Sequence, residues 1–217
     1  MKALLYRASR SLLALRRPTK QANLQSLGER GETFESLTIR EATESDIPAL
    51  ADLHVRTWRD TYTGLLDRQS LAGPTVEIRE HQWREAFATS CDRWFCFVVA
   101  NQRGQLVGFV KGIVGNDEHP DAGELNKIYL DREYQRLGLG RRLVGHAVRR
   151  FLERGMQSMS AYVEPRNPSC GFFEKLGGEW LREPDGSINH CWYIWRDLAR
   201  LGRLCPIDTP GPRIIGP

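Results

Sequence analysis

Glu124-Leu-Asn-Lys-Ile-Tyr-Leu130, Gln135-Arg-Leu-Gly-Leu-Gly140 and the segment that follows them decide the fold of this chain. Residues 124–130 alternate as a β-strand does, and residues 131–138 read as a loop. Apolar side chains then recur at helical spacing, at Leu139, Leu143, Ala147, Val148, Phe151 and Leu152, until Gly155 ends the helix. The sequence therefore predicts a strand, a glycine-containing loop and a long amphipathic helix.

A strand, a glycine-containing loop and the start of a helix, in this order, can together form an anion-binding site. The first turn of a helix has unpaired N–H groups, and the helix dipole adds about half a positive charge there. Gly138 and Gly140 carry no side chain, so an anion could approach the backbone closely, and Arg136, Arg141 and Arg142 add positive charge. The loop is a candidate site for a phosphate group.

Three known phosphate-binding patterns can be compared with Gln135–Gly140. A P-loop requires Gly-Lys-Ser/Thr, but Arg141 and Arg142 follow Gly140. A dinucleotide fingerprint requires a third glycine, where this chain has Leu143. The loop matches in full the Gln/Arg-x-x-Gly-x-Gly/Ala pattern of the GNAT superfamily of N-acetyltransferases. An ordinary glycine-bearing helix start is the remaining alternative.

The chain resembles the GNAT superfamily from about Leu37 to Leu198, through several short motifs in the right order. These motifs are Ile39-Arg-Glu-Ala42 with Ser45-Asp46, Trp58-Arg-Asp-Thr-Tyr-Thr-Gly-Leu-Leu66, Glu124-Leu125, Asn167-Pro-Ser169, Phe172-Phe-Glu-Lys-Leu-Gly177 and Trp195-Arg-Asp-Leu198. Each motif is weak alone, and their order makes the resemblance specific.

The expected fold is α/β (α+β), a single GNAT-like domain at residues 37–200. Strands are predicted at 37–40, 95–100, 106–114, 124–130, 158–163, 179–182 and 191–195, and helices from Ile47, at 75–87, from Leu139 and at 168–176. The order of these elements predicts one mixed central sheet flanked by helices. The resemblance implies about seven strands, splayed at the cofactor site.

The two ends differ from this domain. Residues 1–28 hold six basic side chains and no acid. Residues 29–217 therefore hold 25 basic and 27 acidic side chains, and this part of the chain has no surplus positive charge with which to bind nucleic acid. Residues 1–36 read as a basic amphipathic extension and a linker, and residues 201–217 as an irregular tail. The expected location is cytoplasmic, or the mitochondrial matrix if residues 1–28 are a presequence.

Other protein classes find little support. No apolar run approaches the ~20 residues that span a bilayer. The five cysteines contain no C-x-x-C pair and the five histidines no H-E-x-x-H, so we expect neither a disulfide framework nor a metal.

The resemblance implies acetyl-coenzyme A as co-substrate, without a metal. The backbone of the strand before the loop would pair with the pantetheine arm, the loop amides would hold the pyrophosphate, and a later asparagine and a phenylalanine would touch the cofactor. On this chain the positions are Ile128, Tyr129, Leu130, Gln135, Arg136, Leu137, Gly138, Leu139, Gly140, Arg141, Asn167 and Phe173.

Direct attack of an amine on the thioester needs a base, because an ammonium has no free lone pair. Glu124 matches a carboxylate base of many relatives, and Asn126, on the same face, could help to hold a water; an edge-strand solubility charge is the alternative for Glu124. Phe173 replaces the tyrosine that usually protonates the departing thiolate. Water, Tyr162 or Ser169 could take that role.

The acceptor is poorly determined by sequence. Trp58 and Tyr62 could line the amine site, although aromatic residues at this spacing are more often core. The acceptor could be a small-molecule or a peptide amine, and a homodimer is common among relatives. Three alternatives stay open: a non-catalytic acyl-coenzyme A binder, a transferase for another short acyl-coenzyme A, and an interaction module unrelated to coenzyme A.

Overall fold

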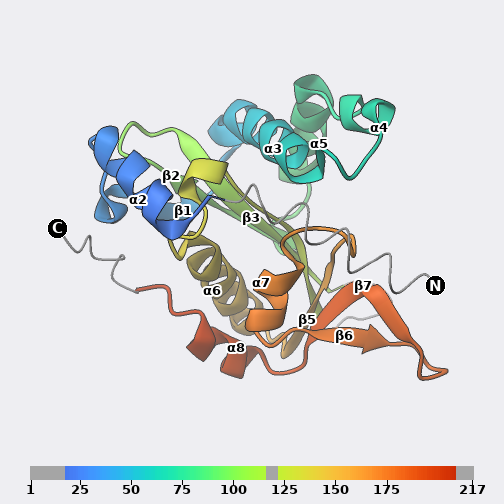
Figure 1. The fold of residues 1–217 in the computed structure, drawn as a ribbon. Coiled ribbons are helices and arrows are strands. Elements are labelled where there is room, and N and C mark those ends of the chain that lie inside the picture. The colour runs from blue at the N-terminus through green and yellow to red at the C-terminus, as the bar shows by residue number, and fades with distance from the viewer. Residues whose placement is uncertain (1–17, 116–121, 209–217) are drawn as a thin grey trace.

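The computed structural model describes residues 18–115 and 122–208, which are built around a seven-stranded sheet (Figure 1). The strand order is β1-β2-β3-β4-β5-β7-β6, with one parallel pair, β4 and β5, among antiparallel neighbours. The strands are β1 Thr38–Glu41, β2 Trp94–Ala100, β3 Leu106–Val114, β4 Ala122–Leu130, β5 Ser158–Tyr162, β6 Glu179–Arg182 and β7 Ile188–Trp195. The predicted mixed sheet is confirmed.

Helices cover both faces of the sheet (Figure 1). Helices α3 Ile47–Tyr62 and α5 Val76–Ala88 pack on one face, and α6 Leu139–Glu153 and α8 Leu198–Leu204 on the other. Strand β2 is buried on both faces: Trp94, Cys96 and Val98 face α3 and α5, whereas Phe95 and Phe97 face α6. Two further helices are short, α4 Arg68–Ala72 and α7 Cys170–Lys175.

Local sequence explains where the flanking helices begin. Thr75 caps α5 by accepting a hydrogen bond from the Ile78 amide, and Pro48 lies in the first turn of α3, where a missing N–H costs little. Before α3, the Asp46 carboxylate accepts from the Thr43 amide and pairs with Arg40 at 2.7 Å. The pKa of Asp46 is therefore lowered, first by Arg40.

Strands β4 and β5 diverge soon after they meet. They pair only from Ala122–Glu124 to Ser158–Ser160, and β4 then continues to Leu130 without a partner strand on that side. Strand β4 also carries a bulge, because Lys111 pairs with Lys127 and Gly112 with Leu125, which leaves Asn126 as the extra residue. Strands β4 and β5 thus splay apart as predicted. The bulge at Asn126 also changes the direction of the side chains of β4 next to this splay.

The structure corrects the interpretation of the two flanking segments. Residues 20–36, expected as a linker, contain helix α2 Lys20–Glu29 and a 3₁₀ turn Phe34–Ser36, and Leu24, Leu27 and Phe34 are buried in the core. The tail expected from residue 201 begins inside α8, where Leu201 and Cys205 are buried against α6. A few apolar side chains pack both segments against the core. The overall composition of the segments is polar and does not predict this packing. The boundaries 37–200 stay a prediction, but the packed core extends beyond them.

The proposed presequence overlaps this packed region. A removable segment of residues 1–28 would include most of α2, whose Asn23, Leu24 and Leu27 are buried. The amphipathic pattern at residues 1–17 lies outside the described residues. Within residues 18–115 and 122–208, every helix is too short or too polar to cross a bilayer.

Candidate active site

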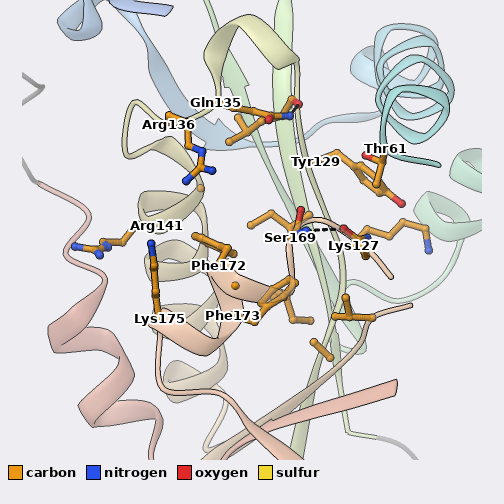
Figure 2. A pocket seen from close by; sticks show the side chains of 18 of the residues that line it. Thr61, Lys127, Tyr129, Gln135, Arg136, Arg141, Ser169, Phe172, Phe173 and Lys175 are labelled. Atoms are coloured by element: carbon orange, nitrogen blue, oxygen red, sulfur yellow. Dashed lines mark hydrogen bonds between the residues drawn. The ribbon is translucent and has the colours of Figure 1, made fainter. Parts of the chain in front are cut away.

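A cavity of about 550 Å³ opens where β4 and β5 diverge (Figure 2). Its lining comes from β4 beyond Glu124, the loop that leads into α6, the first turn of α6, the end of β5, α7 with the segment before it, and the end of α3, with Phe34 and Pro206 at single positions. Of the predicted site residues, it includes Tyr62, Asn126, Ile128, Tyr129, Leu130, Gln135, Arg136, Leu137, Gly138, Gly140, Arg141, Tyr162, Asn167 and Phe173. Segments distant in the sequence thus meet at one place.

The loop before α6 has the backbone of an anion site. Arg136 (φ 64°) and Gly138 (φ 92°) both adopt left-handed conformations, and such alternation turns successive N–H groups toward one concave side. The first amide of this helix to pair within it is that of Arg142, which donates to the Gly138 carbonyl. The amides of Leu139, Gly140 and Arg141 precede that bond, and they have no carbonyl within the helix to pair with.

Gly140 allows close packing around this loop. A Cβ at this position would lie in van der Waals contact, 3.4 Å from the Phe172 ring and 3.6 Å from the Leu130 side chain, so a side chain larger than that of alanine would have to displace one of them. Leu139, predicted beside it, has a fully buried side chain that faces the core and does not line the cavity. Only its backbone amide can serve the site.

The cavity is strongly basic. Among the lining residues that the structure describes, five are basic and none is acidic: Lys127, Arg136, Arg141, Arg142 and Lys175. Figure 2 shows Arg136, Arg141 and Lys175 around the start of α6, and Lys127 apart from them, toward α3. The cavity is therefore suited to an anionic ligand, with one basic residue on a separate side.

Helix α2 holds the loop from outside, which sequence reasoning missed. The buried Asn23 amide donates to the backbone carbonyls of Arg132 and Gln135, at 2.9 and 2.8 Å. Close by, the Tyr134 hydroxyl donates to the buried Glu32 carboxylate at 2.8 Å. No motif marks Asn23, because its partners are backbone atoms more than 100 residues away.

The free edge of β4 faces the same cavity. Beyond Glu124, its backbone groups on the β5 side have no strand partner, because pairing with β5 ends there. The Gln135 side chain donates to the Leu130 carbonyl at 3.0 Å and so ties the loop to the end of this edge. Ile128, Tyr129 and Leu130 therefore lie where an extended ligand could pair with the strand.

Glu124 does not line the cavity, in contrast to Asn126. The Asn126 amide donates to Glu124 Oε1 at 2.6 Å, and Asn126 Oδ1 accepts from Lys127 Nζ at 2.6 Å. Asn126 was expected on the face of Glu124; it is instead the bulged residue, and its side chain still reaches the carboxylate. Lys127, not predicted, lies on the other side of this chain of contacts. Burial, ahead of neighbouring cations, lowers its pKa to about 8.

Two aromatic residues beside the cavity differ in exposure. Tyr162 lines it with 57 % of its surface exposed, and its pKa is raised, first by the nearby Cys191. Phe173 is 4 % exposed and packs among the rings of Phe172 and Tyr193. Of the two, Tyr162 alone carries a hydroxyl group.

Asn167 connects the two sides of the cavity. Its side-chain oxygen accepts from the Ser169 amide at 2.8 Å, and its side-chain nitrogen donates to the Tyr62 hydroxyl at 3.5 Å. Tyr62 and Thr61 line the cavity from α3, whereas Trp58 lies behind Tyr62, with ring centroids 5.2 Å apart. Trp58, expected at the amine site, is not among the residues that line this cavity, and its place at the amine site stays a prediction.

Helix α3 places a buried histidine against the face of the sheet that contains Tyr129. His54 is 3 % exposed and contacts the rings of Trp83, Phe109 and Tyr129. Burial, ahead of nearby cations, lowers its pKa to about 2, so it is neutral. Within the part of the chain that the structure describes, no three His, Cys, Asp or Glu side chains converge to hold a metal ion.

Comparison with known proteins agrees with this architecture. The model of the acetyltransferase (GNAT) family matches residues 49–178. The uncharacterised N-acetyltransferase YuaI of Bacillus subtilis is 31 % identical over 174 residues, which cover 77 % of this chain and 98 % of that protein. A spermidine N(1)-acetyltransferase of Thermoplasma acidophilum is 26 % identical, over 70 % of this chain and 93 % of its own.

A solved structure has the same fold. The PaiA N-acetyltransferase of Thermoplasma acidophilum, in complex with coenzyme A, superposes with a TM-score of 0.64 at 18 % identity, over 74 % of this chain and 99 % of its own. Because the family model covers more than half of the chain and the fold agrees, this protein is an acyltransferase that belongs to the GNAT acetyltransferase family.

Proposed function

We propose that this protein transfers the acetyl group of acetyl-coenzyme A to an amine by direct attack, with both substrates bound together. The observation that carries the proposal is the basic cavity that joins the unpaired amides of the α6 start to the free edge of β4. Structures of the same fold support it: PaiA contains coenzyme A, and a phosphinothricin acetyltransferase of Sinorhizobium meliloti contains acetyl-coenzyme A.

The residues present fit such a cofactor. The amides from Arg136 to Arg141 would bind the pyrophosphate, with positive charge from Arg141 and Lys175, which line the cavity beside them. The edge of β4 that β5 leaves without a strand partner offers backbone groups near Ile128 to the amides of the pantetheine arm, whereas the Leu130 carbonyl is already bound by the Gln135 side chain. When bound there, acetyl-coenzyme A supplies an acetyl group activated as a thioester.

Glu124 is proposed as the base. The attacking amine must lose a proton as its nitrogen forms the new bond to the acetyl carbon and the carbon–sulfur bond breaks. Glu124 lies behind Asn126, whose amide is fixed at 2.6 Å from the carboxylate and lines the cavity. We therefore infer that Glu124 takes the proton through Asn126-bound water.

The departing sulfur leaves as a thiolate, and Tyr162 is proposed as its proton donor. Its raised pKa keeps the hydroxyl protonated at neutral pH, and it lines the cavity. A thiolate is a fair leaving group near neutral pH, so this step depends less on an acid than the attack does on a base. Backbone amides at the β4 splay can stabilise the negative charge that develops on the carbonyl oxygen.

Phe173 favours one alternative, a protein that binds acyl-coenzyme A without turnover. An assay that counts both products decides between the two: acetylated amine and free coenzyme A thiol, measured with a panel of small amines and peptides. Equal amounts of both products support the proposal. Binding of acetyl-coenzyme A with no acetylated product from any amine would favour the non-catalytic binder.

A further inference from the structure

Two lysines lie directly opposite each other beside the cavity. Lys111 on β3 and Lys127 on β4 are paired residues of the antiparallel register. Lys127 shares its face of β4 with Tyr129, which packs under α3 and α5, and Lys111 Nζ lies 5.3 and 5.2 Å from the ring centroids of Trp83 and Trp94 on that face. Like charges opposite each other destabilise a sheet, and burial increases the cost.

Arg79 brings a third cation to this face from α5. Its guanidinium is half-buried and pairs with Gln82 through Nη1, whereas its Nε finds no hydrogen-bond partner among the described residues. The charges of Arg79 and Lys111 both lower the pKa of Lys127. We call Arg79, Lys111 and Lys127 the basic cluster.

Within the described part of the chain, one acid acts on both lysines of the basic cluster. Among the described residues, Glu124 is the carboxylate whose charge acts on both Lys111 and Lys127, and its Oε1 already accepts from Asn126. His54, which faces the cluster from α3, is neutral. Counted over the described residues, three cations and one carboxylate leave a net positive charge on the side of the cavity away from the α6 loop.

From this geometry we propose that the acceptor amine also carries an anionic oxyacid group, a carboxylate or a phosphorus oxyacid, which Lys127 binds with support from Arg79 and Lys111. The acceptor is thus of the amino-acid type rather than a polyamine. This inference rests on the proposed function, because it describes the second substrate of the same reaction.

The spacing of the side chains limits the distance between the two groups of the acceptor. Lys127 Nζ and the Glu124 carboxylate are linked through the single side chain of Asn126, by two contacts of 2.6 Å. An amine that Glu124 deprotonates and an anion that Lys127 binds must therefore be only a few bonds apart. A polyamine would place further positive charge beside the basic cluster, which is unfavourable.

Matched pairs of acceptors test the inference. The panel contains amino acids, the amides of the same amino acids, aminoalkylphosphonates, and spermidine. We expect kcat/KM at least tenfold higher for the free acid than for its amide, and the phosphonates distinguish a carboxylate site from a site for phosphorus oxyacids. We call the kcat/KM of the acid divided by that of its amide the acid-to-amide ratio. Lys127→Met should reduce this ratio at least tenfold, mainly by raising the KM of the acid.

Lys175→Met is the matched control, because Lys175 also lines the cavity but lies beside the α6 loop. It should raise the KM of acetyl-coenzyme A and leave the acid-to-amide ratio unchanged. If Lys127→Met does not fold, Arg79→Gln tests the same cluster from α5 and should lower the same ratio.

Binding without turnover provides a second readout. The same panel is titrated by calorimetry into protein saturated with coenzyme A, and only the acids should bind. If amides or spermidine bind or react as well as the acids, or if Lys127→Met leaves the ratio unchanged, the inference is wrong although the proposed function stands. If no compound of the panel binds, the inference also falls. Failure to bind acetyl-coenzyme A at all would instead overturn the proposed function.

Discussion

The two sides of the cavity are built in different ways. On the α6 side, the backbone forms the site: left-handed Arg136 and Gly138, the unpaired amides that follow, and the free edge of β4. On the side of α3 and α5, the Lys127 side chain lines the cavity, and Lys111 and Arg79 lie behind it. The shape of the backbone side depends little on which side chains are present, whereas a few substitutions can change the charge of the other, side-chain side.

The largest expected effect is on kcat, from substitution of Glu124, which lies between the two sides of the cavity. Glu124→Gln keeps the shape but cannot accept a proton, so kcat should fall by about 10² to 10⁴-fold while the affinity for acetyl-coenzyme A is unchanged. Steady-state kinetics and calorimetry separate the two quantities. Glu179→Gln, on the edge strand β6, is the control and should not change kcat. Full activity in Glu124→Gln would exclude this base.

Removal of the outside support should weaken only the backbone side. Asn23→Ala deletes two hydrogen bonds to the carbonyls of Arg132 and Gln135, each worth roughly 1 kcal/mol, so acetyl-coenzyme A should bind up to about thirtyfold more weakly. Calorimetry measures the change. Asn189→Ala, which removes a side-chain bond to Glu183 on the β6–β7 hairpin, should leave the affinity as it is. Equal affinity in Asn23→Ala would show that α2 does not order the loop.

A smaller effect is expected from the proton donor to sulfur. Tyr162→Phe should lower kcat several-fold, because a thiolate departs readily even without an acid. Phe173→Tyr should change kcat less than about tenfold, since that ring is buried among Phe172 and Tyr193. Steady-state turnover at saturating substrates checks both variants. A gain of several orders of magnitude in Phe173→Tyr would contradict the assignment of Tyr162.

The smallest expected effect is on the stability of the folded protein, from substitution of Lys127. The pKa of Lys127 is lowered to about 8 in the folded protein, so the unfolded chain holds this proton more tightly between pH 8 and about 10.4. The charged lysine therefore destabilises the fold below pH 8, and this cost disappears by about pH 10.4. Urea unfolding should show Lys127→Met to be more stable than the wild type at pH 7, and the difference should shrink at pH 10. An equal difference at both pH values would contradict this account.

The sequence reveals the backbone side more readily than the side-chain side. Gly138, Gly140 and the strand before them are neighbours along the chain, so a short pattern is enough to predict the loop and the edge of β4. The basic cluster depends on the register of β3 against β4 and on the packing of α5. Neither the Lys111–Lys127 pair nor Arg79 can be inferred from spacing.

The same reason explains the other missed features. Asn23 acts through backbone carbonyls of a loop more than 100 residues away, and its own segment looks like a polar linker. The bulge at Asn126 changes the alternation of β4, which a strict period of two cannot predict. The seven strands were predictable because each carries its own apolar pattern between turn residues.

Calorimetric titration of acetyl-coenzyme A tests the central claim most directly. The proteins compared are the wild type, Gly138→Trp and Gly104→Trp. Both glycines have positive φ, 92° and 76°, with open space where a Cβ would point, but only Gly138 lines the cavity. We predict that the wild type and Gly104→Trp bind acetyl-coenzyme A and that Gly138→Trp does not. A wild type that does not bind, or a Gly138→Trp variant that binds equally well, would contradict the account.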